Sequence, residues 1–184
     1  LDGDGKKDNP YQIATADDLL EFADKVNNKN QTSAWAELTA NIDLSSVCSK
    51  EKGNWTPIGT SSSNPYSGTF NGAGHTISGL YIDSDADYQG LFGYVSGSVQ
   101  NLSVSGSVKG DDNVGGVVGQ NRGSVENCYN TGAVSSSGNR VGGVVGYNSS
   151  GTVTNCYNTG AVNSSGNWVG GVVGVNSGSV TNCY

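Results

Sequence analysis

The last third of the chain repeats almost the same sequence three times, in residues 113–138, 140–166 and 168–184. Glycines recur there and just upstream at intervals of 26, 27 and 28 residues, at Gly93, Gly119, Gly146 and Gly174. Short runs of β-branched residues lie between clusters of Gly, Asn and Ser. A fixed period of this length predicts a solenoid, in which each repeat forms one coil stacked on the next. A thin solenoid also suits a chain with 34% hydrophobic residues and 29 glycines.

The sequence divides into three parts. Residues 1–34 form an N-terminal cap, residues 35–112 form degenerate coils with a long loop over 45–68, and residues 113–184 form the regular repeats. Thr15 is a suitable N-cap for one amphipathic helix, whose apolar positions are Leu19, Leu20, Phe22, Ala23 and Val26. We expect this helix to cover the open first coil, because an uncovered strand edge invites association. The long loop is expected either to fold over the solenoid or to be functional.

Stacking places equivalent residues in rows along the solenoid. Each coil of about 27 residues offers three short strands, VGGVVG, SVxNC and GAV, and so a roughly triangular cross-section. One row is Asn41, Gly79, Asn101, Asn127, Asn155 and Asn182, and the next is Ile42, Leu80, Leu102, Cys128, Cys156 and Cys183. Asn suits a repeated bend, since it tolerates left-handed backbone and its side chain both donates and accepts along a stack. A second such row is Asn121, Asn148 and Asn176.

The four cysteines include three at equivalent repeat positions, Cys128, Cys156 and Cys183. Stacked coils would bring neighbours within about 4.8 Å, which is close enough for a disulfide. Their Cβ atoms would point the same way, however, and this strains the bond. Such a row also cannot converge on a zinc ion. We expect free, buried thiols that act as small hydrophobic residues.

Charge is distributed unevenly along a chain of net charge −7. Of the 16 acidic residues only Glu126 lies in the regular repeats, together with the cations Arg122 and Arg140. The lack of a basic stripe excludes a nucleic-acid ligand. No stretch is long and apolar enough to insert into a membrane. Because the chain has no leader and stops in mid-repeat, we expect a piece of a longer protein, truncated at its C-terminus.

Aromatic residues are the best candidates for ligand binding. Tyr129, Tyr157 and Tyr184 are predicted to form an outward row, and further candidates are Trp55, Tyr66, Tyr88, Tyr147 and Trp168. Exposed aromatic rings bind sugar faces and protein surfaces well. The alternative is that the stacked tyrosines only support one another along the ladder. Both interpretations stay open on the sequence.

Ionisable groups that suit catalysis or metal binding are few. Asp83, Asp85 and Asp87 lie in one loop and are weak candidates for calcium, with a solvated loop as the alternative. His75 is the only histidine, and no sequence neighbour supplies the acid or nucleophile that a catalyst needs. There is no HExxH motif, which excludes a zinc peptidase in this segment. We predict no catalytic residue and no cofactor, with calcium as the one candidate ion.

The chain resembles proteins of the GLUG-motif family. The motif, G-L-x-G before a short strand, is matched directly by GLFG at 90–93. GVVG at 116–119, 143–146 and 171–174 are variants of it with Val in place of Leu. DNPYQI, TADDLLEFADKVN, LTANIDL, WTPIG and FNGAGHTISGL extend the resemblance over nearly the whole chain. It implies a right-handed parallel β-helix on secreted or surface-anchored bacterial proteins. Such segments occur in adhesin-like chains and beside IgA-cleaving metallopeptidase domains, and the family has no agreed catalytic residues.

Together these observations predict an all-β, right-handed parallel β-helix of about five to six coils with one N-terminal capping helix. The expected function is that of a non-catalytic surface module, a rigid scaffold or stalk, with adhesion to host glycoprotein or glycan as a further role. A carbohydrate-active β-helix enzyme and the non-catalytic region of an IgA-cleaving peptidase are the alternatives. End-to-end self-association is expected at the coil edge formed by 169–184.

Overall fold

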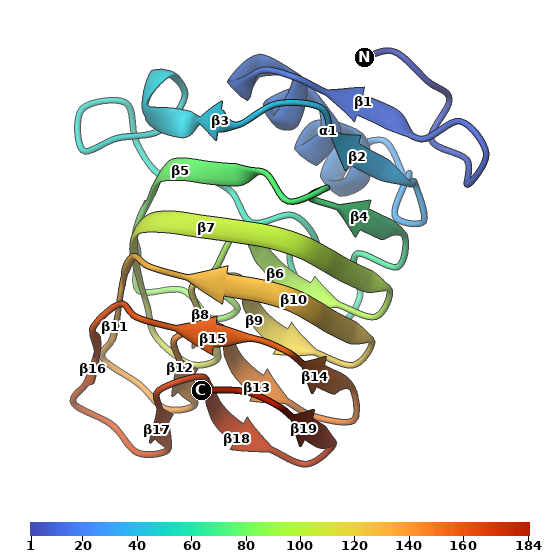
Figure 1. Cartoon of the computed structure of the whole chain (residues 1–184). Coiled ribbons are helices and arrows are strands. Elements are labelled where there is room, and N and C mark those ends of the chain that lie inside the picture. The colour runs from blue at the N-terminus through green and yellow to red at the C-terminus, as the bar shows by residue number, and fades with distance from the viewer.

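The computed structural model describes all residues 1–184 and forms a parallel β-solenoid of about six turns, as the sequence predicts (Figure 1). The strand pairs of the coils are parallel, and those of the regular repeats are in register, so that each coil hydrogen-bonds to the next. The largest sheet has 12 strands, seven of them in the order β1-β2-β4-β7-β10-β14-β19. Their bounds are β1 Tyr11–Ile13, β2 Ala36–Leu38, β4 Thr69–Asn71, β7 Ser98–Gly110, β10 Ser124–Asn130, β14 Thr152–Thr154 and β19 Ser179–Thr181.

Five further strands of this sheet pair beside that path. They are β3 Ile42–Asp43, β5 Thr76–Asp83, β11 Ala133–Ser136, β15 Tyr157–Asn158 and β16 Val162–Ser164. Two smaller sheets complete the coils, in the orders β17-β12-β8 and β18-β13-β9-β6. Their strands are β6 Phe92–Val95, β8 Val114–Gly115, β9 Val118–Asn121, β12 Val141–Gly142, β13 Val145–Asn148, β17 Val169–Gly170 and β18 Val173–Asn176.

The VGGVVG segment forms two strands rather than the one that the sequence predicts. In the first regular repeat, β8 ends at Gly115 and β9 begins at Val118, and the two belong to different sheets. The turn between them is tight: a Cβ atom on Gly115 would lie 2.2 Å from the carbonyl oxygen of Val118. Because the chain turns between them, Val117 and Val118 are both fully buried. Val144 and Val145 in the next coil are likewise both fully buried.

Helix α1, Ala16–Asn28, lies behind β1 and β2 at the N-terminal end of the stack (Figure 1). Its start is fixed by a capping box, in which Thr15 Oγ1 accepts from the Asp18 amide and the Asp18 carboxylate accepts from the Thr15 amide. The expected apolar face is buried at Leu19, Phe22, Ala23 and Val26. Leu20 was wrongly included in that face, since 47% of its surface is exposed.

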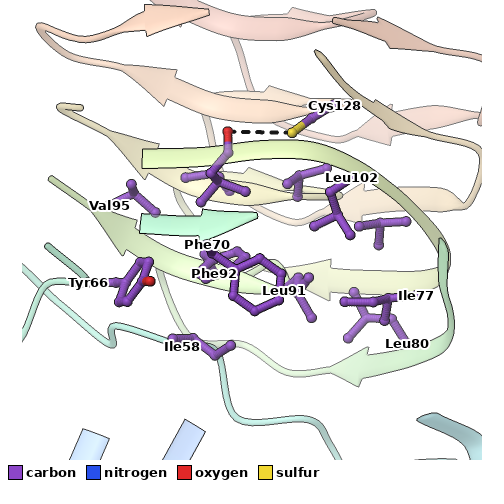
Figure 2. Close-up of a cluster of buried hydrophobic side chains, with 14 of the residues drawn as sticks. Ile58, Tyr66, Phe70, Ile77, Leu80, Leu91, Phe92, Val95, Leu102 and Cys128 are labelled. Carbon is purple, nitrogen blue, oxygen red and sulfur yellow. Dashed lines mark hydrogen bonds between the residues drawn. The ribbon is translucent and has the colours of Figure 1, made fainter. Parts of the chain in front are cut away.

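The long loop over 45–68 forms part of the wall of the solenoid. It begins with the 3-10 turn Leu44–Ser46, and isolated parallel bridges then pair Ile58 with Phe92 and Tyr66 with Val95. Tyr66, Phe70 and Phe92 point into the interior and contact one another (Figure 2). Phe22 of α1 contacts the rings of Tyr66 and Phe70 at centroid distances of 5.9 Å. Large aromatic side chains therefore fill the first coils, where the repeat is degenerate.

Asparagine ladders shape the bends of the regular coils. The residues of the first row, Asn101, Asn127, Asn155 and Asn182, all have φ between 51° and 56°, the left-handed conformation that the sequence predicts. The row is shifted in the earlier coils, because β5 carries a register irregularity between Ile77 and Leu80. Ile42 consequently pairs with Ile77, and Leu80 pairs with Gly106. The predicted places of Ile42 and Leu80 in the row that contains Cys128 are therefore wrong.

Candidate functional site

The predicted tyrosine row is present as a stack. The rings of Tyr129 and Tyr157 lie 4.5 Å apart with an interplanar angle of 6°, and those of Tyr157 and Tyr184 lie 5.3 Å apart at 10°. In-register pairing of β10 with β15 sets the first distance, since Tyr129 pairs directly with Tyr157. Reduced solvation, together with the two neighbouring phenols, raises the pKa of the Tyr157 hydroxyl. The stack thus presents ring edges and hydroxyl groups outward.

This geometry limits how the tyrosine row can bind a sugar. An aromatic ring holds a sugar through its flat face, and both faces of Tyr157 are covered by its neighbours in the row. The mutual support that the sequence left as an alternative is therefore present in the contacts. A ligand at this row would have to bind the hydroxyl groups and the ring edges.

Two other predicted ligand-binding residues are inside the protein. Trp55 is 2% exposed and donates its indole N–H to the Leu91 carbonyl at 3.1 Å. Tyr66 is completely buried and donates its hydroxyl to the Ala34 carbonyl at 2.8 Å. Burial raises the pKa of the Tyr66 hydroxyl well above its ordinary value. Neither ring can meet a ligand, so the prediction for these two residues is wrong, whereas Trp168 is 59% exposed.

The cysteines are free, as expected, and Cys48, Cys128 and Cys156 are buried. Cys183, in the last coil, was also expected to be buried but is only partly so. The Cys128 thiol lies 3.6 Å from the Val99 carbonyl oxygen of the preceding coil, the contact drawn as a dashed line in Figure 2. Cys156 and Cys183 make the same contact one and two coils further along, with Val125 and Val153. Burial raises the pKa of Cys128 well above the ordinary thiol value. A buried thiol with a raised pKa is a poor nucleophile.

The predicted calcium loop has its carboxylates engaged with protein groups. Asp83 accepts a hydrogen bond from Lys109 at 2.9 Å, and Asp87 accepts one from the Asp112 amide at 3.0 Å. Asp85 lies in the same exposed loop. No group of three or more His, Cys, Asp or Glu side chains is arranged to hold a metal ion. His75, the single histidine, lies with Nδ1 3.3 Å from Asn41 Oδ1 at a bend between coils.

The internal asparagine rows form hydrogen-bonded ladders that join the coils of the repeats. Asn121 donates to Asn148 Oδ1 at 3.0 Å, and Asn148 donates to Asn176 Oδ1 at 2.7 Å. A third ladder, from Asn130 to Asn158 at 2.9 Å, was not predicted. Its signal was present in the sequence, because the tripeptide CysTyrAsn recurs with the repeat.

No helix of the protein has both the length and the apolar character needed to cross a bilayer.

Comparison with known proteins confirms the resemblance seen in the sequence. Residues 110–135 and 137–163 match the family model described as "The GLUG motif". The chain is 38% identical over 154 residues to Halomucin of Haloquadratum walsbyi, which covers 78% of this chain and 2% of that protein. It is 34% identical over 185 residues to a candidate Gly-rich membrane protein of Evansella cellulosilytica, covering 80% of this chain and 21% of the relative. The chain thus spans only a small part of these relatives.

A solved structure shares the fold. The crystal structure of a candidate immunoglobulin A1 protease from Bacteroides ovatus superposes with a TM-score of 0.73 at 23% sequence identity. The match covers 98% of this chain and 67% of that chain. At this level of identity the likeness concerns the fold alone. The whole chain, including the helix and the degenerate coils, therefore follows an architecture that is also found in an experimental structure.

Proposed function

We propose that this GLUG-motif repeat chain is a non-catalytic, rigid module of a longer secreted or cell-surface protein, in which it acts as a scaffold or stalk. The names of its relatives, a mucin and a Gly-rich membrane protein, support a place outside the cell or at its surface. Adhesion to a glycoprotein or glycan is the finer form of the same proposal.

The observation that carries the proposal is the continuity of polar ladders along the solenoid axis. Asn121 and Asn148 are completely buried, and each uses its amide to join its own coil to the next. Asn148 also donates to the Ser179 carbonyl of the next coil, at 3.2 Å. Buried, fully bonded polar networks rigidify a fold, because bending the stack would break bonds where water cannot replace them. No buried side-chain nitrogen or oxygen lacks a partner.

The thiols and carboxylates that could act in catalysis are buried or bound to other groups of the protein. The thiols point into the core, and the carboxylates of Asp83 and Asp87 bind Lys109 and a backbone amide. A carbohydrate-cleaving β-helix would need two or more carboxylates that converge on one groove. The acids of this chain lie in its cap, its loops and the degenerate coils, outside the regular coils except for Glu126. These placements favour a scaffold over the alternative of a carbohydrate-active enzyme.

A second candidate is the non-catalytic region of an IgA-cleaving peptidase. The observation that favours it is the structural match, over 98% of this chain, to the candidate immunoglobulin A1 protease. In that role the solenoid would position or extend a catalytic domain, and it would need no active site of its own. The two proposals differ in whether secretory IgA is a partner, which a direct binding measurement with immobilised IgA distinguishes.

Small-angle X-ray scattering of the 184-residue chain tests the rigid-module proposal. At neutral pH, we expect the scattering curve to match one rigid body with the dimensions of the solenoid, both at low salt and in 1 M salt. The salt concentration should have no effect, because the ladders are hydrogen-bonded and not ionic. A curve that requires an ensemble of bent shapes would contradict it. The variant Asn148→Ala is the sensitive control, since it interrupts the central ladder without changing the surface.

A further inference from the structure

A second row of left-handed residues runs along the solenoid. Tyr88, Asn113, Arg140 and Trp168 have φ values of 57°, 60°, 61° and 59°. Each immediately precedes a residue of a parallel ladder, in which Gln89 pairs with Val114, Val114 with Val141 and Val141 with Val169. The four residues are therefore stacked on consecutive coils. We call them the variable bend row.

The bend does not explain which side chains stand in this row. A left-handed backbone is unfavourable for a residue other than Gly, and Asn and Asp tolerate it best among the rest. The other left-handed row of the regular coils keeps Asn on every coil, from Asn101 to Asn182. The variable bend row instead holds a phenol, an amide, a guanidinium and an indole. Non-glycine residues held in this conformation cluster at binding sites, where the side chain is needed.

A neighbouring row varies in the same way. Strand register stacks Tyr94, Gln120, Tyr147 and Val175 on β6, β9, β13 and β18. The two rows touch on two of the coils. The rings of Tyr88 and Tyr94 meet edge to face at 5.8 Å, and the Arg140 guanidinium lies 5.3 Å from the ring centroid of Tyr147.

Sequence differences between the regular repeats concentrate in these two rows. The buried positions repeat as Val, Asn or Cys, and most outward positions change only among Ser, Thr and Asn, with Arg122 and Glu126 as exceptions. In a solenoid the constant positions build the scaffold. Positions that change strongly in size and chemistry while the scaffold stays constant are free to serve recognition.

The chemistry of this surface suits an oligosaccharide. Trp168, in the last coil, is 59% exposed, and Tyr88 and Tyr147 are partly exposed. Asn113 and Tyr94 of the same two rows are buried and support the surface from below. In contrast to the stacked tyrosine row, these rings do not cover one another face to face. Arg140 lies over one face of Tyr147, so Tyr88 and Trp168 offer the flat faces for the C–H surface of a sugar. Arg140 and Gln120 carry N–H donors for hydroxyl groups, and Arg140 also donates to Asn113 at 3.2 Å.

We propose that the solvent-accessible members of the two rows form a binding surface for an oligosaccharide that lies along the solenoid axis. They are Tyr88, Gln120, Arg140, Tyr147, Trp168 and Val175. The rise of about 4.8 Å per coil allows successive sugar units to meet successive coils. Because the surface carries one cation and no carboxylate of its own, hydroxyl groups and ring faces would dominate recognition. This inference rests on the proposed non-catalytic role and specifies where recognition occurs.

The repeats themselves supply a matched test variant. The substitutions R140N, Y147Q, W168N and V175Q give the later coils the residues that Asn113 and Gln120 already provide in the first regular coil. Asn keeps the left-handed bend without strain, so circular dichroism and the unfolding midpoint should change little. The single variant W168N is the second reagent if the fourfold variant does not fold. Y129S and Y157S, on the separate tyrosine row, are the controls.

Affinity electrophoresis through mannan, xylan, polygalacturonate and mucin glycans measures the binding. We expect at least one of these probes to retard the wild-type chain, with binding about tenfold weaker in the matched variant or in W168N and unchanged in the controls. Periodate oxidation of the probe should abolish the effect. Absence of retardation by all four probes, equal retardation of the matched variant, or loss in the tyrosine-row controls alone would overturn the proposal. None of these outcomes bears on rigidity, which scattering tests independently.

Discussion

Asn148 donates a hydrogen bond to Asn176 of the next coil at 2.7 Å, and it accepts one from Asn121 of the preceding coil at 3.0 Å. Asn148 is completely buried, but Asn176 is exposed. The same side chain in the same repeat position is thus protected from water in one coil and hydrated in the next. This contrast provides a test of how much the ladder stabilises the fold.

Asn148→Ala should lower the free energy of unfolding by about 1–3 kcal/mol, because it removes an amide from a ladder that water cannot enter. Chemical denaturation followed by circular dichroism measures the loss. Asn176→Ala is the matched control and should cost much less, since water already replaces part of its bonding. Equal losses for the two variants would show that the ladder is not a buried network.

Thr15→Ala should destabilise the chain by about 1 kcal/mol, as the substitution removes the N-cap of α1. Asp17→Asn, in the same first turn but outside the capping box, is the control and should change stability little. Thermal unfolding of the three proteins at neutral pH checks the difference. A Thr15→Ala protein as stable as wild type would mean that packing of Phe22, and not capping, fixes the helix.

The capping box also predicts a dependence on pH. Partial burial acts to raise the pKa of Asp18, but hydrogen bonds from the Ala14 and Thr15 amides and the Thr15 hydroxyl outweigh it and lower that pKa. A carboxyl with a lowered pKa stabilises the fold above its unfolded value, near 3.9. This contribution is lost as the pH falls below about 4. Asp18→Asn should therefore have a shallower loss of stability in acid than wild type, measured by denaturation between pH 3 and 6.

The thiols should differ in reactivity with their place in the row. Burial raises the pKa of both Cys128 and Cys183, but Cys128 is completely buried, whereas Cys183 is partly exposed. We expect an alkylating reagent to modify Cys183 first, at a rate that increases with pH beyond the ordinary thiol range of about 8.5, since only the thiolate reacts. Peptide mass spectrometry of partly alkylated protein reads out the order. Modification of Cys128 before Cys183 would contradict the packing described.

The last coil of the 184-residue chain should favour self-association. Val169 and Val180 are 45% and 38% exposed there, although the equivalent Val141 and Val153 of the preceding coil are completely buried. Exposed apolar strand edges pair with other edges. Sedimentation velocity should show dimers that increase with concentration, and Val180→Asp should suppress them. A monomer at all concentrations would speak against this edge as an association site.

The regular coils were predictable from sequence, whereas the coils before them were predictable only in part. Where the period is strict, the positions of Asn127, Cys128 and Tyr129 follow from counting, and the structure stacks them as predicted. In the degenerate coils the count fails, because β5 carries an irregularity between Ile77 and Leu80. Sequence spacing cannot reveal such a shift, since it depends on how one coil hydrogen-bonds to the next.

The candidate ligand-binding residues were also predictable only in part. Trp55 and Tyr66 lie in a polar loop of Ser, Asn and Gly, and composition alone predicts that such aromatic residues are exposed. They are buried because Ile58 and Tyr66 extend the sheet that contains β6, which turns the loop into part of the wall. Tyr88 and Trp168 were predicted as single candidates, but their alignment in one row was not. The left-handed backbone at Tyr88, Arg140 and Trp168 contradicts the ordinary preferences of those residues.

The central claim, a module without catalytic activity of its own, is tested most directly by a search for turnover. The purified chain would be incubated at high concentration with secretory IgA and with the four polysaccharide probes, and products would be measured by mass spectrometry. The account predicts intact IgA and unchanged polysaccharide chain lengths. Product that forms in proportion to the concentration of the chain, and that is lost when the loop acids Asp83, Asp87 and Asp112 are changed to Asn, would contradict it.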